Sequence, residues 1–389
     1  MKLKKDKWEN VILNEICDVR DGTHDSPKYH NEGYPLITSK NITGGFIDFS
    51  ETNLISENDY IQINKRSLVD NGDILLSMIG TVGIPVLVDK KIDFAIKNVG
   101  LIKFAKQDTI YNRYLLNVLQ SDMFQRQIQA KTSGTAQKFI SLGLIRSLQI
   151  PLPPLEEQKQ IAALFQSIET AIEQVEGQEK NLLTLKNQML RELLGETQRF
   201  GNLLSENDFD KVKFEKLAFS ISERVEPQKT TLDTYVGLEH LDPDNLIIAR
   251  TGKPGDVIGT KLTIYKGDII FGKRRAYQRK VAVSHFDGIA SAHSMILRAN
   301  EKHIEKEFLP FFMQSDVFMN RAVQISEGSL SPTIKWKTLA TQEFLLPKKE
   351  KQKGLTAVFK QFDNTRGHLK QQKTTLKNLK QKLLSEILG

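Results

Sequence analysis

One short loop carries most of the side chains that could do chemistry in this sequence. Between two expected strands, residues 268–272 and 280–284, five of the eight residues from Lys273 to Lys280 are basic. Lys and Arg contact phosphates, while Arg and Gln side chains can read the edges of guanine and adenine. A merely solvated basic hairpin is the alternative. The candidate DNA-contacting residues here are Lys273, Arg274, Arg275, Tyr277, Gln278, Arg279 and Lys280.

Short polar loops in the first half of the chain give a second, weaker set of candidates. They lie in Asp21–Tyr29, Thr38–Ile42, the Gly80–Gly83 turn and Ile96–Asn98. Loops of this composition are also ordinary turns. The candidate DNA-contacting residues in these loops are Thr23, His24, Ser26, Lys28, Thr38, Ser39, Lys40, Asn41, Thr81, Lys97 and Asn98.

No catalytic constellation or metal site is predicted. The sequence holds no phosphate-cradling or dinucleotide-binding glycine motif, and its seven histidines are scattered. Glu157-Gln158-Lys159 resembles the end of a nuclease motif, but it falls on an expected helix and its later counterpart reads Lys351-Gln352-Lys353. A metal site would not survive loss of that carboxylate, so a solvated helix face is the better interpretation.

The chain contains two diverged copies of one unit. Leu152–Gly195 aligns without a gap on Leu346–Gly389, at a shift of 194 positions. Upstream, "NGDILL" from Asn71 matches "KGDIIF" from Lys266 at a shift of 195. Self-similarity at a fixed period indicates a repeated structural unit.

Each aligned segment is expected to form a long helix behind a proline, Pro153 or Pro347, ending at Gly195 or Gly389. Apolar residues recur at alternating spacings of three and four, which is typical of paired helices. Glu179 and Lys186 interrupt the first series, and Arg366, Lys373 and Lys380 the second. The predicted helix-pairing residues are Ile161, Phe165, Ile168, Ile172, Val175, Leu182, Met189, Leu355, Phe359, Phe362, Leu369, Leu376 and Leu383.

Opposite charge favours pairing of the two helices with each other. Leu152–Gly195 has 4 basic and 7 acidic residues, whereas Leu346–Gly389 has 11 basic and 3 acidic ones. Charged flanking positions select partners in coiled coils. Packing of each helix on its own domain, or contact of the basic distal helix with DNA, remains an alternative.

Before each of these helices the sequence predicts a mixed α/β domain. Strands are expected at 73–79, 84–88, 262–265, 268–272 and 280–284, and helices at Tyr111–Gln129 and Glu305–Gln324. The expected division is a first domain over 1–150, a central helix over 151–195, a second domain over 196–345 and a distal helix over 346–389.

Bulk composition is that of a globular chain of more than one domain. The chain has 389 residues, 39% hydrophobic and 26% charged, with a net charge of +8. Cys17 is the only cysteine, and no apolar run approaches the roughly 18 residues of a membrane span. We expect a soluble cytoplasmic protein.

With these features the sequence resembles the DNA specificity (S) subunits of type I restriction–modification systems. The resemblance rests on Ser147–Glu169, which contains "IPLPPLEEQ", on Asn71–Gly83, and on the duplicated domain-and-helix plan. The distal copy departs from it where Lys348 and Lys349 replace a Pro-Leu pair.

The resemblance implies two target-recognition domains that each read one half of a bipartite DNA site, held apart by antiparallel helices. It implies double-stranded DNA, two methylation (M) subunits and two restriction (R) subunits as partners. S-adenosylmethionine would be bound by the M subunits, and ATP and Mg²⁺ by the R subunits. The chain itself would hold no cofactor and would not be an enzyme. A coiled-coil scaffold or DNA-binding protein without restriction partners is the competing interpretation.

Overall fold

The computed structural model describes residue 3 and residues 5–90, 92–104, 109–132, 139–194 and 204–389. Its contacts divide the chain into two compact units. Unit 1 consists of Met1–Glu176 and Gln371–Gly389, and unit 2 of Gly177–Lys370. Each unit therefore combines a globular part with portions of both long helices.

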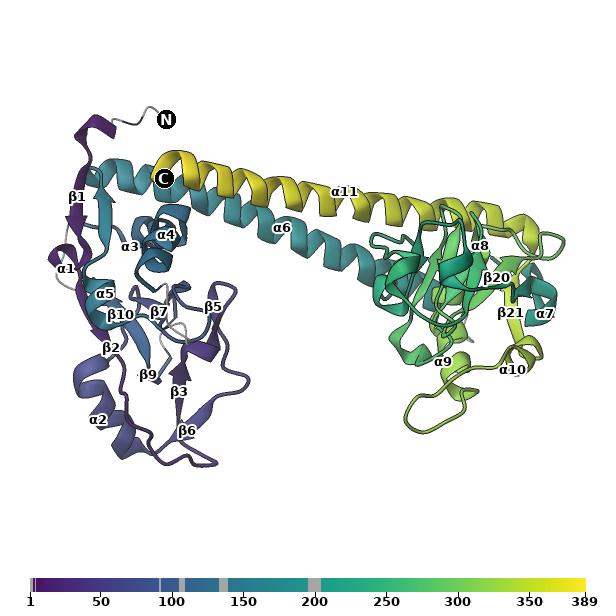
Figure 1. Ribbon diagram of the computed structural model, residues 1–389, viewed down its shortest axis with the longest axis horizontal. Coiled ribbons are helices and arrows are strands. Elements are labelled where there is room, and N and C mark those ends of the chain that lie inside the picture. The colour runs from purple at the N-terminus through teal and green to yellow at the C-terminus, as the bar shows by residue number, and fades with distance from the viewer. Residues whose placement is uncertain (1–2, 4, 91, 105–108, 133–138, 195–203) are drawn as a thin grey trace. The chain divides into compact units, whose positions relative to one another are not determined.

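Unit 1 is built on an antiparallel four-stranded sheet with a second, mixed sheet beside it (Figure 1). The first sheet has the order β2 (Asp18–Asp21), β10 (Val99–Lys103), β7 (Ile74–Ser77), β8 (Pro85–Leu87). The second has the order β6 (Asn53–Ile55), β3 (Tyr34–Thr38), β9 (Ala95–Lys97), in which β3 and β9 run parallel. The remaining elements are η1 (Lys5–Lys7), β1 (Glu9–Ile12), α1 (Leu13–Ile16), η2 (Ser39–Asn41), β4 (Ile42–Thr43), β5 (Phe46–Ile47), α2 (Glu57–Ser67), α3 (Asn112–Gln120), α4 (Asp122–Thr132), α5 (Leu142–Arg146) and β11 (Gln149–Leu152).

Strand β7 explains why the predicted strand at 73–79 reads as a continuous apolar run. Ile74 and Leu76 enter one buried cluster and Leu75 enters another, because successive side chains of a strand point to opposite faces. Both faces of the sheet are thus covered, so no polar alternation remains in the sequence.

Unit 2 repeats this plan. Its central sheet has the order β13 (Ala218–Ile221), β20 (Met295–Ala299), β17 (Ile269–Phe271), β18 (Val281–Val283). A second sheet has the order β14 (Arg224–Val225), β16 (Lys261–Ile264), β19 (Gly288–Ala290), β15 (Tyr235–Val236). The remaining elements are η3 (Glu206–Asp208), β12 (Phe209–Lys213), α7 (Phe214–Leu217), η4 (Pro227–Lys229), η5 (Leu238–His240), η6 (Pro254–Asp256), η7 (Ala276–Gln278), α8 (Phe308–Gln314), α9 (Asp316–Gln324), α10 (Trp336–Ala340) and β21 (Glu343–Pro347). The prediction of two tandem α/β units is confirmed.

Each of the helices predicted at Tyr111–Gln129 and Glu305–Gln324 is in fact two helices. Buried Ser121 separates α3 from α4, and buried Ser315 separates α8 from α9. The Ser315 hydroxyl accepts a hydrogen bond from the Phe318 backbone N–H at 3.3 Å and so caps the second helix. The apolar spacing continued across each break, so periodicity alone did not reveal it.

The two long helices, α6 (Leu155–Leu194) and α11 (Lys349–Leu388), have 40 residues each. In unit 1, Glu169 and Glu176 of α6 contact Lys380 and Lys377 of α11. In both units the α11 partner number falls as the α6 number rises, so the paired segments are antiparallel (Figure 1). Gly195, the predicted stop, lies outside the described residues.

Side chains of the predicted helix-pairing series are all at least half-buried. Ile161, Phe165, Ile168, Val175 and Phe359 are buried. The others, Ile172, Leu182, Met189, Leu355, Phe362, Leu369, Leu376 and Leu383, are half-buried. Toward the helix ends these residues share buried clusters with the globular part of their own unit. The series therefore packs on the globular part as well as facing the partner helix. Among the described residues, no helix has both the length and the apolar character needed to cross a membrane.

Candidate DNA interface

In unit 1 the structure brings the four predicted loops together. Strand β3 pairs in parallel with β9 and places Thr38 beside Lys97, so both strands end at one edge. Thr23 forms a bridge with Lys97 from the loop that follows β2. The Ser39 hydroxyl accepts hydrogen bonds from the backbone N–H groups of Met78 and Ile79, at 2.9 and 3.2 Å, which joins the turn after β7 to the same edge.

A glycine allows this close approach. A Cβ atom added at Gly22 would lie 2.2 Å from the carbonyl oxygen of Ile96, so a larger residue would push the Thr23 loop away from β9. The Thr23 N–H donates to that same carbonyl oxygen at 3.0 Å. Gly22 therefore positions the side chains that follow it.

His24 is held at the centre of this edge. Its Nδ1 lies 2.7 Å from Asn98 Oδ1 and its Nε2 lies 3.0 Å from Asp21 Oδ2. Asp21 is buried and also pairs with Arg66. His24 is thus an exposed ring with fixed orientation, which suits contact with a ligand.

Other candidates in unit 1 have internal roles. Asn41 is buried, and its amide oxygen accepts hydrogen bonds from the N–H and hydroxyl of Thr38, at 3.0 and 2.9 Å. Thr38, Ser39 and Asn41 therefore support the loop, and their contact with DNA stays a prediction. Ser26, Lys28, Lys40 and Thr81 are exposed, and half-buried Lys97 donates to the Ser26 hydroxyl at 2.5 Å.

In unit 2 the side chains of the basic loop Lys273–Lys280 fall into two groups. Some hold the loop to the rest of the unit, and others can contact a ligand. Arg279 bonds Asp244 at 2.9 Å, Asp316 at 3.0 Å and the Gln314 carbonyl at 2.6 Å. Lys280 donates to the Leu238 carbonyl at 2.7 Å. These two residues anchor the loop, and their contact with DNA stays a prediction.

The side chains left for a ligand are on the other part of the loop. Arg275 and Tyr277 are exposed, and Lys273, Arg274 and Gln278 are half-buried. Arg275 adopts left-handed backbone angles, with φ of 58°, which a non-glycine residue rarely does. The N–H of Arg275 bonds the Pro332 carbonyl at 2.8 Å, which fixes this conformation.

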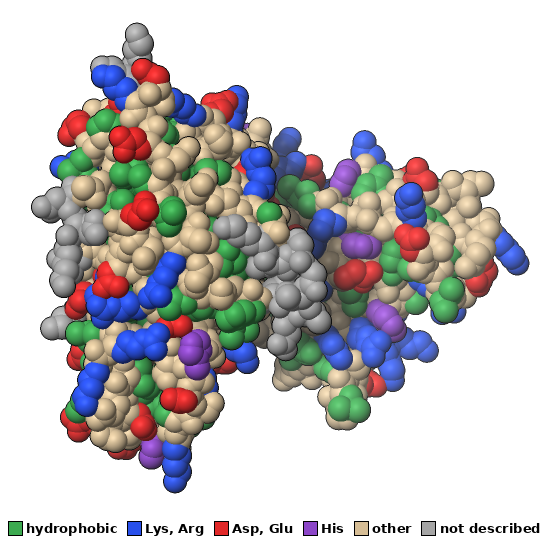
Figure 2. All heavy atoms as spheres, turned by 60° about the vertical axis from the view of Figure 1, so that its left-hand side comes forward, with side chains coloured by type: hydrophobic (Ala, Val, Ile, Leu, Met, Phe, Trp, Pro, Cys, Tyr) green, Lys and Arg blue, Asp and Glu red, His purple; other side chains and the backbone are tan. Residues whose placement is uncertain are grey.

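The sequence analysis missed His293, Lys261 and Arg224, which surround this part of the loop. Burial lowers the pKa of His293, with Arg274, Lys273 and Lys261 acting in the same direction. Burial and then Arg224 lower the pKa of Lys273. His293 stands 195 positions after Asn98, so the repeat could have identified it. Figure 2 shows Lys and Arg side chains gathered beside a histidine at the lower edge of unit 2, at the right of the view.

The residues that interrupt the apolar series of the long helices form ion pairs across the helix pair. In unit 2, Lys186 contacts Asp363 at 2.6 Å, and Arg366 contacts Glu179 at 3.5 Å. Lys186 also donates to the Gln314 side chain at 3.1 Å and so joins the helix pair to α8.

Unit 1 repeats this arrangement with equivalent residues. Lys380 contacts Glu169 at 2.7 Å and Gln120 at 3.1 Å. Lys380 stands 194 positions after Lys186, Gln314 after Gln120, and Asp363 after Glu169. The same three positions of the repeat are therefore used in both units. The arrangement fixes the register of the helices and their attachment to each globular part.

Reversing one of these charges should loosen the helix pair. Glu179→Lys is expected to lower the free energy of unfolding by about 1–2 kcal/mol, because it places two cations together at a partly buried site. Adding Arg366→Glu should restore most of the loss. Exposed Glu173→Lys is the control, with an expected effect below about 0.5 kcal/mol. Urea unfolding of the variants checks this, and equal losses in Glu179→Lys and Glu173→Lys would contradict it.

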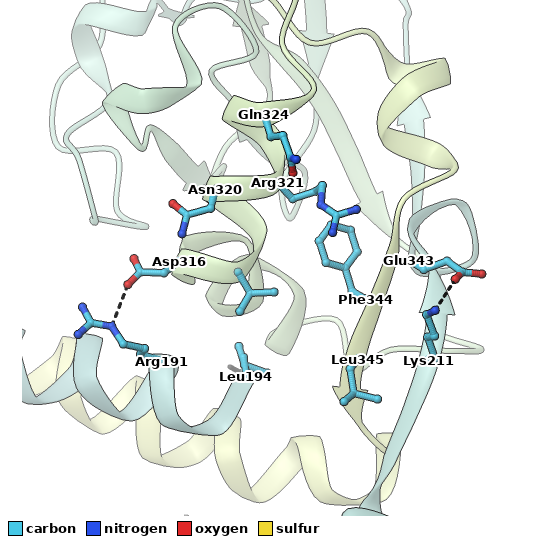
Figure 3. A pocket seen from close by; sticks show the side chains of 11 residues that line it. Arg191, Leu194, Lys211, Asp316, Asn320, Arg321, Gln324, Glu343, Phe344 and Leu345 are labelled. Carbon is cyan, nitrogen blue, oxygen red and sulfur yellow. Dashed lines mark hydrogen bonds and ion pairs between the residues drawn. The ribbon is translucent and has the colours of Figure 1, made fainter. Parts of the chain in front are cut away.

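Figure 3 shows a cavity in unit 2. It has a volume of about 620 Å³ and lies between α9, the end of α6 and strands β12 and β21. Four of its charged side chains pair with one another, Arg191 with Asp316 and Lys211 with Glu343. Arg321 donates to the Gln342 side chain at 2.9 Å. In the described part of the chain no three His, Cys, Asp or Glu side chains come together as a metal site.

Comparison with known proteins identifies the family. A family model described as the type I restriction modification DNA specificity domain matches residues 5–185 and 248–378. The type I restriction enzyme MjaVIII specificity subunit of Methanocaldococcus jannaschii is 22% identical over 408 residues, covering 98% of this chain and 92% of that protein. The EcoBI specificity subunit of Escherichia coli is 24% identical over 229 residues, covering 57% of this chain and 48% of that protein.

Solved structures show the same fold. A chain from a structure of complex assembly and conformational transition of the type I R-M system has a TM-score of 0.62 at 18% identity, covering 99% of this chain and 98% of that one. The S subunit of a type I restriction-modification system from M. genitalium has a TM-score of 0.58 at 15% identity, covering 99% and 97%. Because the family model matches well over half of the residues, in both copies, this chain belongs to the family of type I restriction–modification DNA specificity subunits.

Proposed function

We propose that each unit reads one half of an asymmetric bipartite DNA site, and that the paired helices set the distance between the halves. In this proposal the target-recognition domains are residues 1–150 and 196–345, and the helices are 151–195 and 346–389. The chain acts in the cytoplasm as a non-catalytic subunit.

One observation carries this proposal. In each unit a pair of parallel strands, β3–β9 in unit 1 and β15–β19 in unit 2, ends beside a short 3₁₀ turn. The loop that follows the central strand, β7 or β17, lies at the same edge. A side-chain hydrogen bond closes the turn in the same way in both units. Asn41 Oδ1 accepts it from the Thr38 N–H, and His240 Nδ1 accepts it from the Gly237 N–H, both at 3.0 Å. The side chains displayed there differ between units. One scaffold with two sets of reading side chains suits two unlike half-sites.

The partners follow from the same proposal. Two M subunits dock on the helices and carry S-adenosylmethionine, and two R subunits carry ATP and Mg²⁺, so no cofactor is assigned to this chain. A rigid helix pair holds two weak readers at a fixed separation, which raises their joint affinity without new contacts.

Mapping methylated adenines after co-expression with the cognate M subunit tests the proposal. We expect a motif of two unlike halves separated by a non-specific spacer, and no such motif from the M subunit alone. Tyr277→Ala with Gln278→Ala should relax the sequence of one half only, because base contacts specify and phosphate contacts do not. A continuous or palindromic motif would contradict two dissimilar readers. A complex that assembles without any motif would favour the scaffold alternative.

A further inference from the structure

Unit 2 contains a cluster of positive side chains that is separate from its anchoring contacts. We call Arg224, Lys261, Lys273, Arg274 and His293 the cationic cluster. Arg274 Nη1 lies 3.1 Å from His293 Nε2, and its Nε donates to the Ser331 hydroxyl at 2.9 Å. Lys273 precedes it, and Arg224 and Lys261 come from the paired strands β14 and β16. The five side chains therefore come from three parts of the unit.

Among the described residues the cluster has no acidic partner, whereas several other cations of unit 2 do. Over the described residues, none of its four Lys and Arg side chains forms an ion pair, whereas Arg279, Arg298 and Lys335 all do. The lowered pKa of Lys273 and of His293 shows that adding positive charge here is unfavourable. Lys261, Lys273 and Arg274 are half-buried, and Arg224 and His293 are exposed beside them. Half-buried like charges are costly unless an anion joins them, and such groups concentrate at functional sites.

The backbone at the cluster is held in place before any ligand binds. The Arg274 N–H donates to the His293 carbonyl at 3.3 Å, and the Lys273 carbonyl accepts from the Ile334 N–H at 3.0 Å. With Nε and Nη1 of Arg274 engaged, its Nη2 remains available to a ligand. A preorganised site loses less conformational entropy on binding.

The described residues of unit 1 do not repeat this cluster. At a shift of 195, Met78 and Ile79 stand where Lys273 and Arg274 stand, and Asn98 stands in place of His293. Arg66, on helix α2, pairs with buried Asp21. The two units therefore offer different chemistry at the same edge.

We infer that the cationic cluster binds a backbone phosphate of the DNA half-site read by unit 2, a contact that unit 1 does not make. The phosphate supplies the negative charge that the cluster lacks. This inference rests on the proposed function, because it assumes that the edge faces DNA.

Lys273→Met tests the inference, since Met keeps the length of the side chain and removes the charge. In the complex with the M subunit, affinity for the methylated motif should fall about tenfold, and similarly for non-specific DNA, because phosphate contacts carry no sequence information. The slope of log affinity against log salt should decrease by about 1. The thermal midpoint of the free chain should stay the same or rise, because a repulsive charge is gone. Arg224→Gln, on another strand, should give the same loss.

Lys335→Met is the matched control, because Lys335 is exposed and paired with Glu327. It should leave the salt slope unchanged, and Lys273→Arg should retain it. If the wild-type complex binds its motif but Lys273→Met and Arg224→Gln leave the slope intact, the phosphate site is refuted and the proposed function stands. If the wild-type complex shows no sequence-specific binding, the proposed function itself fails.

Discussion

Asp363→Leu is expected to lower the free energy of unfolding by about 3–5 kcal/mol, because it leaves a buried ammonium group without a counter-charge. Lys186 has a side chain only 3% exposed, and its Nζ bonds Asp363 at 2.6 Å. Burial lowers the pKa of Lys186, which shows that the charged form depends on its partners. Phe311 lies beneath the ammonium at 5.0 Å from the ring centroid but cannot replace a carboxylate. Urea unfolding of the purified chain measures the loss.

Two further variants separate loss of the pair from loss of side-chain contacts. The double variant Lys186→Met with Asp363→Leu should recover to within about 1 kcal/mol of wild type, because no charge remains buried. Glu169→Leu, at the equivalent place in unit 1, should cost only about 1 kcal/mol, since the Lys380 side chain there is 21% exposed. A double variant as unstable as Asp363→Leu alone would show that packing, rather than charge, is decisive.

The second large effect is expected at Gln158 and Gln352, which occupy the same place in the two copies. Gln158 is fully buried; its Oε1 accepts from the Tyr111 N–H at 2.8 Å and its Nε2 donates to the carbonyls of Thr109 and Pro153 at 2.9 and 2.8 Å. Gln352 accepts from the Glu305 N–H at 2.8 Å and donates to the Pro347 carbonyl at 2.7 Å. Each glutamine thus joins the start of a long helix to its own globular part.

Changing either glutamine to Leu should cost about 2–4 kcal/mol, because backbone groups are left buried without hydrogen bonds. The matched controls are Lys159→Ala and Lys353→Ala, which alter the neighbouring exposed residues, also identical in the two copies. They should change the free energy of unfolding by less than about 0.5 kcal/mol. Denaturant unfolding compares the four variants, and a glutamine effect as small as the lysine effect would contradict this role.

The role of Gln158 could not be predicted from the sequence. The sequence indicated that Glu157-Gln158-Lys159 lies on a helix and is not a nuclease motif. It could not distinguish Gln158 from Lys159, because both recur in the second copy. Which of them faces the globular part depends on contacts between segments about 50 residues apart.

In the candidate DNA interface, too, the sequence predicted the composition of the loops but not the partners of their side chains. The basic composition of Lys273–Lys280 was visible in the sequence, and so were the four polar loops of the first copy. That Arg279 faces Asp244 and Asp316, while Arg274 lies against His293, depends on residues far away in the chain. Formal charge does not show whether a cation already has a partner.

By itself the sequence determined the duplicated plan, the mixed α/β units and the long helices, since each follows from local periodicity or from the repeat. The family was indicated by the resemblance of Ser147–Glu169, Asn71–Gly83 and the duplicated plan to known specificity subunits. Only the tertiary structure decided that the residues interrupting the apolar series, such as Lys186 and Lys380, form ion pairs within their units. It also decided which polar loop residues support the fold and which cations of the described residues form no ion pair. The reason is physical: a helix or strand is set by neighbours along the chain, whereas burial and charge pairing are set by whatever the folded chain brings within a few ångströms.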